Sequence, residues 1–135
     1  MSKDLADKAI DIKGKKYVLV ADRILYFNEE YKNGGIETRI VSNPQDENIK
    51  IKAIVTPDCD KPERKFFGHS QATVGVGMVN KTAALENAET SAVGRALAMM
   101  GIGVIESIAS ADEMHKALTK DKALTGDIIE DILKK

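Results

Sequence analysis

The sequence predicts an α+β fold, in which a short helix, a three-stranded antiparallel meander and a long helix form a βββα core with a C-terminal helical extension. Apolar residues recur at helical spacing over residues 17–31, alternate with polar residues over 36–74, and form a broad helical arc over 80–103. With 135 residues, 43% of them apolar, the chain can build one modest core. We therefore expect one domain with short flanking elements.

The first helix is predicted over Tyr17 to Tyr31, because apolar residues recur at i, i+4, i+7 and i+11 from Val20 onward. The Asn33-Gly34-Gly35 turn ends it. Residues 1–14 are polar and charged apart from a short helical stripe between Leu5 and Ile10. We expect these residues to form a flexible N-terminal segment, with the core over 15–105 and the extension over 106–135.

Three strands are predicted at Ile36–Ser42, Ile49–Thr56 and Arg64–Val74. Their short connections favour an antiparallel meander with one buried and one open face. The open face would collect cationic and aromatic side chains, namely Arg39, Lys50, Lys52, Lys65, Phe67 and His69. Such a surface can follow phosphates and stack a base. A solvated sheet face has the same composition, so both interpretations stay open.

The long helix is predicted over Asn80 to Gly103, with Asn80 as its N-cap and Gly101 as the left-handed residue that ends it. Glu89 is expected inside the apolar arc, where a carboxylate needs a partner. Arg95 stands beside a face of small residues, where it could bind a docked phosphate or form a surface ion pair. This face would let a neighbouring subunit or a nucleic-acid backbone come close, and it consists of Ala84, Asn87, Ser91, Gly94 and Ala98.

The C-terminal extension is predicted to contain helices over Ser107–Leu118 and Gly126–Lys135. The second helix has an apolar stripe but is too short to be stable alone. We therefore expect it to dock on the body of the protein or on another subunit.

Composition argues against several classes of function. The single cysteine, Cys59, excludes an internal disulfide and fits a reducing cytoplasm, and neither terminus has a membrane-spanning stretch. A net charge of −1 limits any anion-binding surface to a local patch. The glycine-rich run over 74–79 lacks the dinucleotide fingerprint and the Walker spacing, and Lys81 at the helix start could still reach an anion. Glu86 and Glu89 lie one helical turn apart without a metal partner, so we expect no catalytic residue, metal or cofactor.

Two segments, VADRILYFNEEYKNGGIETRI and ALENAETSAVGRALAMMGIG, resemble single-strand annealing proteins. These are the phage recombination proteins of the Erf/Sak kind, related to the annealing domain of the eukaryotic repair protein Rad fifty-two. The resemblance covers roughly residues 15–105 and implies a βββα core that assembles into rings or helical filaments around single-stranded DNA. Three basic residues of the family's late helix contact the DNA backbone. Gly94 and Ala98 replace two of them here, so only Arg95 carries over.

The resulting hypothesis is an ATP-independent, non-enzymatic protein that binds and anneals single-stranded DNA in recombination and repair. It would act as a homo-oligomer in the cytoplasm of a bacterial host, without a membrane, and with a phage or host single-stranded-DNA-binding protein as a further partner. The residues expected to bind single-stranded DNA are Arg95, Lys81, Lys65, Lys52, Lys50, Arg39, Phe67 and Ser91. The alternatives are a monomeric module for double-stranded RNA or DNA, which would prefer duplex over single strands, and a protein–protein adaptor.

Overall fold

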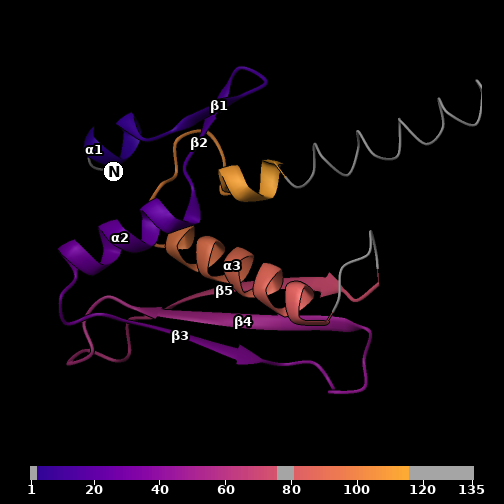
Figure 1. Ribbon diagram of the computed structural model, residues 1–135. Coiled ribbons are helices and arrows are strands. Elements are labelled where there is room, and N and C mark those ends of the chain that lie inside the picture. The colour runs from indigo at the N-terminus through magenta and orange to yellow at the C-terminus, as the bar shows by residue number, and fades with distance from the viewer. Residues whose placement is uncertain (1–2, 76–80, 116–135) are drawn as a thin grey trace, which may run out of the picture.

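A three-stranded antiparallel sheet with two helices over one of its faces forms the body of the protein (Figure 1). The computed structural model describes residues 3–75 and 81–115, and it confirms the predicted α+β class. Along the chain the elements are α1 (Lys3–Asp7), β1 (Ile10–Ile12), β2 (Lys15–Tyr17), α2 (Val20–Glu30), β3 (Gly35–Ile40), β4 (Asn48–Thr56), β5 (Phe66–Thr73) and α3 (Lys81–Met99). A further helical turn covers residues 111–115.

The sheet has the strand order β3-β4-β5, so β4 is central and β3 and β5 are its edges. The predicted alternation is confirmed on β4 for Ile49, Ile51, Ala53 and Val55, which are buried under the helices, although Ile54 on the other face is buried as well. In the register of the ladder, Thr38 pairs with Ala53 and Ala53 pairs with Gly68. Residues of even number on β3 and β5 therefore share the helix-covered face with the odd-numbered residues of β4.

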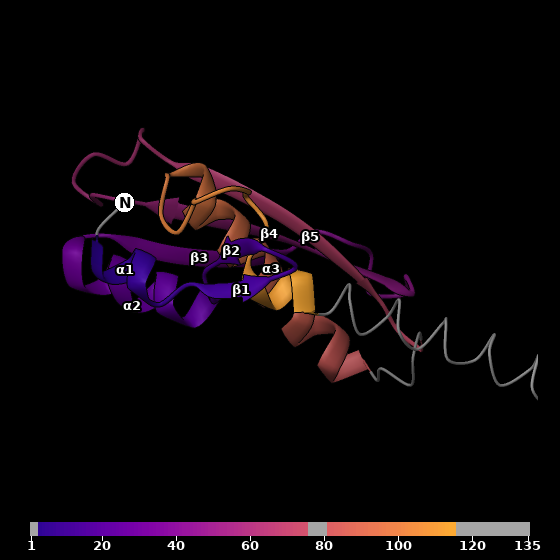
Figure 2. The same ribbon diagram turned by 90° about the horizontal axis from the view of Figure 1, so that it is seen from above.

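The helix α3 approaches the sheet closely because both partners have small residues at the contact. A Cβ atom added to Gly68 would clash with the carbonyl oxygen of Ala92 and the backbone nitrogen of Ala96. Seen from above, α3 crosses the strands obliquely, and α1 and α2 lie to its β3 side (Figure 2). The helix is therefore covered from two directions, by the sheet below and by α2 beside it.

This double cover corrects our expectation for the small-residue face of α3. Ala84, Ser91, Gly94 and Ala98 are buried within the single chain. A Cβ atom on Gly94 would lie 2.7 Å from Cγ2 of Val20. The glycine thus allows α2 to approach α3, and within this chain the face is not open to a second subunit or a nucleic-acid strand.

The end of α3 follows the prediction. Gly101 has a φ of 96°, which is the left-handed region that glycine adopts without strain. Ile102 donates its backbone N–H to the carbonyl of Leu97 at 3.0 Å, closing the last turn. The expected N-cap, Asn80, lies outside the described residues.

The N-terminal region differs from the prediction, because a hairpin follows α1. Strands β1 and β2 pair antiparallel around Lys13 and Gly14, which have φ values of 53° and 83°. Positive φ at both turn residues is typical of a two-residue hairpin loop. Each strand has only three residues, too few to show alternation in the sequence. Since Lys15–Tyr17 belongs to β2, α2 begins at Val20 and not at Tyr17, although the predicted helical spacing is confirmed by the buried Val20 and Phe27.

In the segment after α3, the helix begins later than predicted. Residues 104–110 form bends and coil, and the helical turn begins only at residue 111, within the predicted Ser107–Leu118 helix. The predicted helix at Gly126–Lys135 lies outside the described residues.

Candidate nucleic-acid interface

The face of the sheet turned away from the helices gathers most of the expected binding residues. Arg39, Lys52 and His69 occupy one row across the three strands, since Arg39 pairs with Lys52 and Lys52 with His69. Lys50 lies two residues from Lys52 on the same side of β4, and Lys65 directly precedes β5. In the described chain no helix lies over this side (Figure 1). We call Arg39, Lys50, Lys52, Lys65, Phe67 and His69 the open sheet face.

Phe67 is the aromatic residue of the open sheet face, and its side chain is already in contact with a cation. Residue 67 is 43% exposed, and Nζ of Lys52 lies 4.4 Å from the centre of its ring. A cation over a ring is attracted by the negative π-face, by about 0.5–1 kcal/mol at an exposed site. The contact holds the Lys52 ammonium above the sheet and occupies one side of the ring that a base would otherwise stack on.

Arg39 also has a partner, but a weak one. Its Nε donates to Oε1 of Glu37 at 2.9 Å, and both side chains are more than half exposed. Exposed ion pairs contribute about 0–1 kcal/mol because water screens them. The guanidinium can therefore leave Glu37 for a phosphate at little cost.

The other expected residues lie elsewhere. Arg95 is on the helix side of the sheet, where its Nε donates to Oε1 of Glu113 at 2.9 Å. This is the surface ion pair that the sequence left open as an alternative. Ser91 is only 9% exposed, so it is not available to a ligand on the surface of this fold. Lys81 is the first residue of α3, and its side chain is not among those described.

We expected Glu89 to be buried in the apolar arc of α3, but it is exposed at the edge of that arc. Its Oε2 accepts a hydrogen bond of 2.7 Å from the hydroxyl of Thr38 on β3. The alanines at 88, 92 and 96 turn toward the sheet instead, because only small side chains fit that close contact. The carboxylate therefore stays in contact with water and needs no buried partner.

A buried arginine, Arg23, was missed in the sequence. It is 0% exposed, and its Nη1 and Nη2 donate to the carbonyl oxygens of Gly94 at 3.0 Å and Ala109 at 3.3 Å. Burial lowers the pKa of Arg23, whereas the charges of Glu113 and Asp112 raise it. The side chain nevertheless stays charged, as arginine does in proteins. The spacing Val20, Arg23, Phe27 on the buried stripe of α2 is a signal that could have revealed it.

The backbone around Arg23 is shaped to fit its side chain. Gly103 has a φ of 79°, and a Cβ atom there would lie 2.5 Å from Nε of Arg23. Among the described residues, Nε has no hydrogen-bond partner. Arg23 thus links α2, α3 and the segment after α3, which is a structural role, and its full burial keeps it away from a ligand on the surface.

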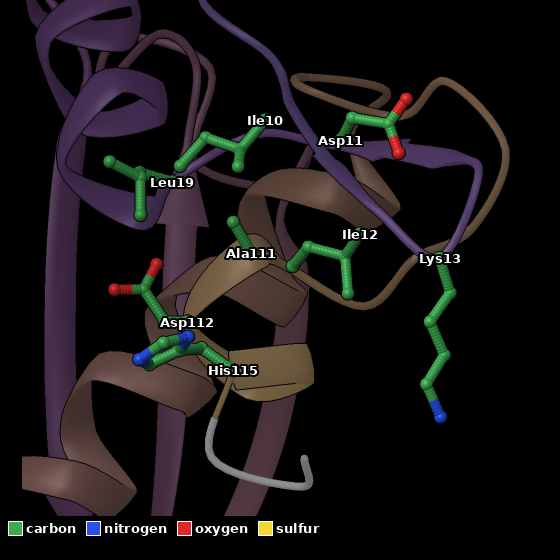
Figure 3. Close-up of a pocket in the computed structure, with 8 residues that line it drawn as sticks. All are labelled: Ile10, Asp11, Ile12, Lys13, Leu19, Ala111, Asp112 and His115. Atoms are coloured by element: carbon green, nitrogen blue, oxygen red, sulfur yellow. The ribbon is translucent and has the colours of Figure 1, made fainter. Parts of the chain in front are cut away.

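A cavity of about 670 Å³ lies on the helix side, between β1, the start of α2 and the turn at 111–115 (Figure 3). Its walls are largely apolar, and Asp112 and His115 lie next to each other on one side of it. Oδ2 of Asp112 accepts the backbone N–H of Val20 at 2.8 Å and so caps the start of α2. Asp112 therefore has a structural role. In the part of the chain that the structure describes, no three His, Cys, Asp or Glu side chains are grouped as metal ligands would be.

The model of a family described as Slr1353 N-terminal dsRNA-binding domain-like matches residues 24–100, which is more than half of the chain. The match runs from α2 through the sheet to the end of α3. No curated protein and no solved structure gives a significant match.

This match overturns the resemblance to phage annealing proteins, because the matched family is not one of them. It fits the alternative of a nucleic-acid-binding module on a strand–helix layout and gives no support to recombination annealing. The annealing resemblance rested mainly on a late helix with small residues around Arg95. In the structure those residues pack against α2 and the sheet. Among the described residues, no helix is long and apolar enough to cross a membrane.

Proposed function

The chain belongs to the Slr1353 N-terminal dsRNA-binding domain-like family, and from this membership we propose that it is a module that binds double-stranded RNA through its open sheet face. The observation that supports the surface most directly is the placement of Arg39, Lys50 and Lys52 on one uncovered side of the sheet, with Lys65 next to the start of β5. The proposed role is binding without a chemical step.

The distribution of acidic residues supports this choice of surface. The exposed side of α2 carries Glu29 and Glu30, and the connection between β3 and β4 carries Asp46 and Glu47. Such carboxylates repel phosphates. Among the described residues of the three strands, the acidic residue on the same side as the open sheet face is Glu37, which is paired with Arg39. A local cationic patch of this kind reconciles phosphate binding with a net charge of −1.

The shape of the open sheet face favours a duplex over a single strand. Neighbouring strands lie about 4.8 Å apart and alternate residues on one strand about 6.6 Å apart, so the cations form a broad array rather than a narrow track. A-form RNA presents a wide, shallow minor groove bordered by phosphates, which such an array can span. A single strand is usually held by successive aromatic platforms. Here Phe67 already has Lys52 over its ring.

The proposal is tested by measuring the fluorescence anisotropy of a labelled 20-base-pair RNA duplex, with its separate strand and the matching DNA duplex as competitors. We expect the RNA duplex to bind most tightly, with a dissociation constant on the order of 1–100 µM at physiological salt, the range of sequence-independent binding. Equal competition by the single strand would contradict duplex recognition. Absence of any binding would favour the protein–protein adaptor.

A matched pair of variants tests the surface. Lys52→Gln removes a cation from the open sheet face, and Arg95→Gln removes one from the helix side. Loss of one charged contact of about 1 kcal/mol should weaken duplex binding about fivefold in Lys52→Gln. The Arg95→Gln variant should bind like the original protein. An equal loss in both variants would show that the cations act through overall charge and not through the proposed face.

A further inference from the structure

The exposed edge of β3 has a sequence that is complementary to itself. Residues 36–40 read Ile-Glu-Thr-Arg-Ile. If a second copy of this strand runs antiparallel with Thr38 opposite Thr38, each Glu37 faces an Arg39 and each Ile36 faces an Ile40. We propose that two copies of this chain associate along β3 in this register, around a two-fold axis at Thr38.

The hydrogen-bonding pattern of β3 fits this register. In an antiparallel ladder, bonded and non-bonded residue pairs alternate. Val41 donates its N–H to Lys50 on β4 at 2.9 Å, so the backbone groups of Ile36, Thr38 and Ile40 point away from β4. These outward groups are the ones that a second β3 would bond in the proposed register. Glu37 and Arg39 would then form non-bonded pairs, in which side chains lie closer together.

Charge favours a second copy as the partner. In the single chain Arg39 is bound to Glu37 of its own strand, in a pair that is exposed to water. The proposed register replaces this bond by two reciprocal Glu37–Arg39 pairs across the axis. Edge strands often avoid association through charged side chains, especially lysine, or through proline. The β3 sequence, GIETRI, has no lysine or proline, and its two charges are opposite and so complementary to those of a second copy.

Exposed apolar surface at the same edge points to the same partner. Ile40 is 60% exposed on the side of the sheet that the helices occupy. A groove of about 430 Å³ runs between α2, α3 and β3, and its apolar lining includes Ile24, Ile36 and Val93. In the proposed register the partner's Ile40 lies opposite Ile36, at this groove. Pairing would therefore bury an exposed isoleucine of each copy against apolar residues of the other.

The other edge lacks these features. Strand β5 has the sequence FFGHSQAT, with no pair of opposite charges. Pairing through β3 alone closes into a dimer, because a two-fold contact uses the same surface on both copies. The two three-stranded sheets would join into one of six strands, with both open sheet faces on the same side.

The association is measured by sedimentation equilibrium without nucleic acid, so that its result does not depend on the proposed function. Glu37→Arg and Arg39→Glu each place like charges opposite one another in both reciprocal pairs, which should weaken dimerisation about tenfold. The double variant restores opposite charges and should dimerise like the original protein. A monomer at all concentrations up to the millimolar range, or failure of the double variant to recover, would overturn the proposal.

Disulfide trapping tests the register itself. In a Cys59→Ser background, Thr38→Cys places two thiols on the axis, where opposite Cα atoms lie about 5.5 Å apart, within the range of a disulfide. Ile40→Cys is the matched control, because residue 40 faces residue 36 and not its own copy. We expect oxidation to link Thr38→Cys chains rapidly and Ile40→Cys chains slowly. Equal rates, or faster linking through residue 40, would contradict this register.

Discussion

Nη1 of Arg23 on α2 donates a hydrogen bond of 3.0 Å to the carbonyl oxygen of Gly94 on α3. The same residue that permits close approach of the two helices thus accepts a bond from a fully buried cation. Arg23 also reaches Ala109 in the segment that follows α3. Nearby in this segment, Asp112 caps α2 and Glu113 pairs with Arg95. Arg23 therefore acts together with Asp112 and Glu113 to hold the segment after α3 against the two helices.

Replacing Arg23 by methionine should destabilise the protein strongly. The variant keeps much of the side-chain volume but removes the hydrogen bonds from Arg23 to the carbonyls of Ala109 and of Gly94, which keeps its own bond within α3, at a cost of about 1–2 kcal/mol for each bond. We expect the free energy of unfolding in urea to fall by about 2–4 kcal/mol. Arg23→Lys keeps the charge but not the planar fork of donors, so its free energy of unfolding should lie between those of the original protein and of Arg23→Met. A loss below about 0.5 kcal/mol in Arg23→Met, the size of an ordinary surface change, would contradict this role.

Both Gly68→Ala and Gly94→Ala should destabilise the protein, but a second substitution should restore stability only in Gly94→Ala. A Cβ at Gly68 meets backbone atoms of α3, whereas a Cβ at Gly94 meets a methyl group of Val20. Overpacking of this kind costs about 1–3 kcal/mol. Thermal unfolding should show that the added substitution Val20→Ala relieves Gly94→Ala in part and leaves Gly68→Ala unrelieved. Additive losses in the Gly94→Ala/Val20→Ala variant would show that the two sites do not touch.

Phe67→Leu should separate binding of a duplex from binding of a single strand. If phosphates of a duplex are held by the cations of the open sheet face, loss of the ring should change duplex affinity less than about twofold, because the loss of an exposed cation–π contact is small. Stacking of a base on Phe67 would instead contribute about 1–3 kcal/mol, and single-strand affinity would fall about fivefold or more. Anisotropy titrations with both RNAs distinguish the two. A large loss of duplex affinity would contradict phosphate binding as the main contact.

The binding should also depend steeply on salt, since phosphate contacts release counterions. For the RNA duplex, a plot of log affinity against log salt concentration should become shallower by about 1 in Lys52→Gln. Its slope should not change in Arg95→Gln. A slope near zero in the original protein would exclude a mainly electrostatic interface.

Asp58 should titrate at a lower pH than an ordinary aspartate. Its Oδ1 accepts the backbone N–H of Asp60 at 3.0 Å and Nδ2 of Asn33 at 2.6 Å, and these bonds lower the pKa of Asp58. The sign follows from linkage: a carboxyl with a lowered pKa in the folded state stabilises the fold above its unfolded pKa of about 3.9 and loses that effect as the pH falls through the folded value. Carbon NMR should show a pKa of Asp58 that rises in Asn33→Ala. No change in that variant would show that the amide is not a partner in solution.

Much of the architecture could be predicted because it depends on periodicity. Alternation placed Lys50 and Lys52 opposite the buried residues of β4, and the structure confirms it. Gly101 was identified as the helix end because few residues other than glycine adopt its left-handed backbone. The β1–β2 hairpin was not predicted, since three-residue strands are too short to show a period. The family was wrongly assigned because the resemblance rested on two short segments, and the small residues of the later one fit internal packing as well as a docked strand.

The layout of helices and strands and the gathering of cations on the open sheet face follow from local sequence patterns, because side-chain direction in a strand follows from residue parity alone. What the long helix faces follows instead from the packing of the folded chain. Whether Gly94 admits a foreign backbone or the protein's own α2, and whether Arg95 meets a phosphate or Glu113, depends on residues distant in the chain. The local periodicity of α3 does not show which distant segment packs against Gly94 and Arg95.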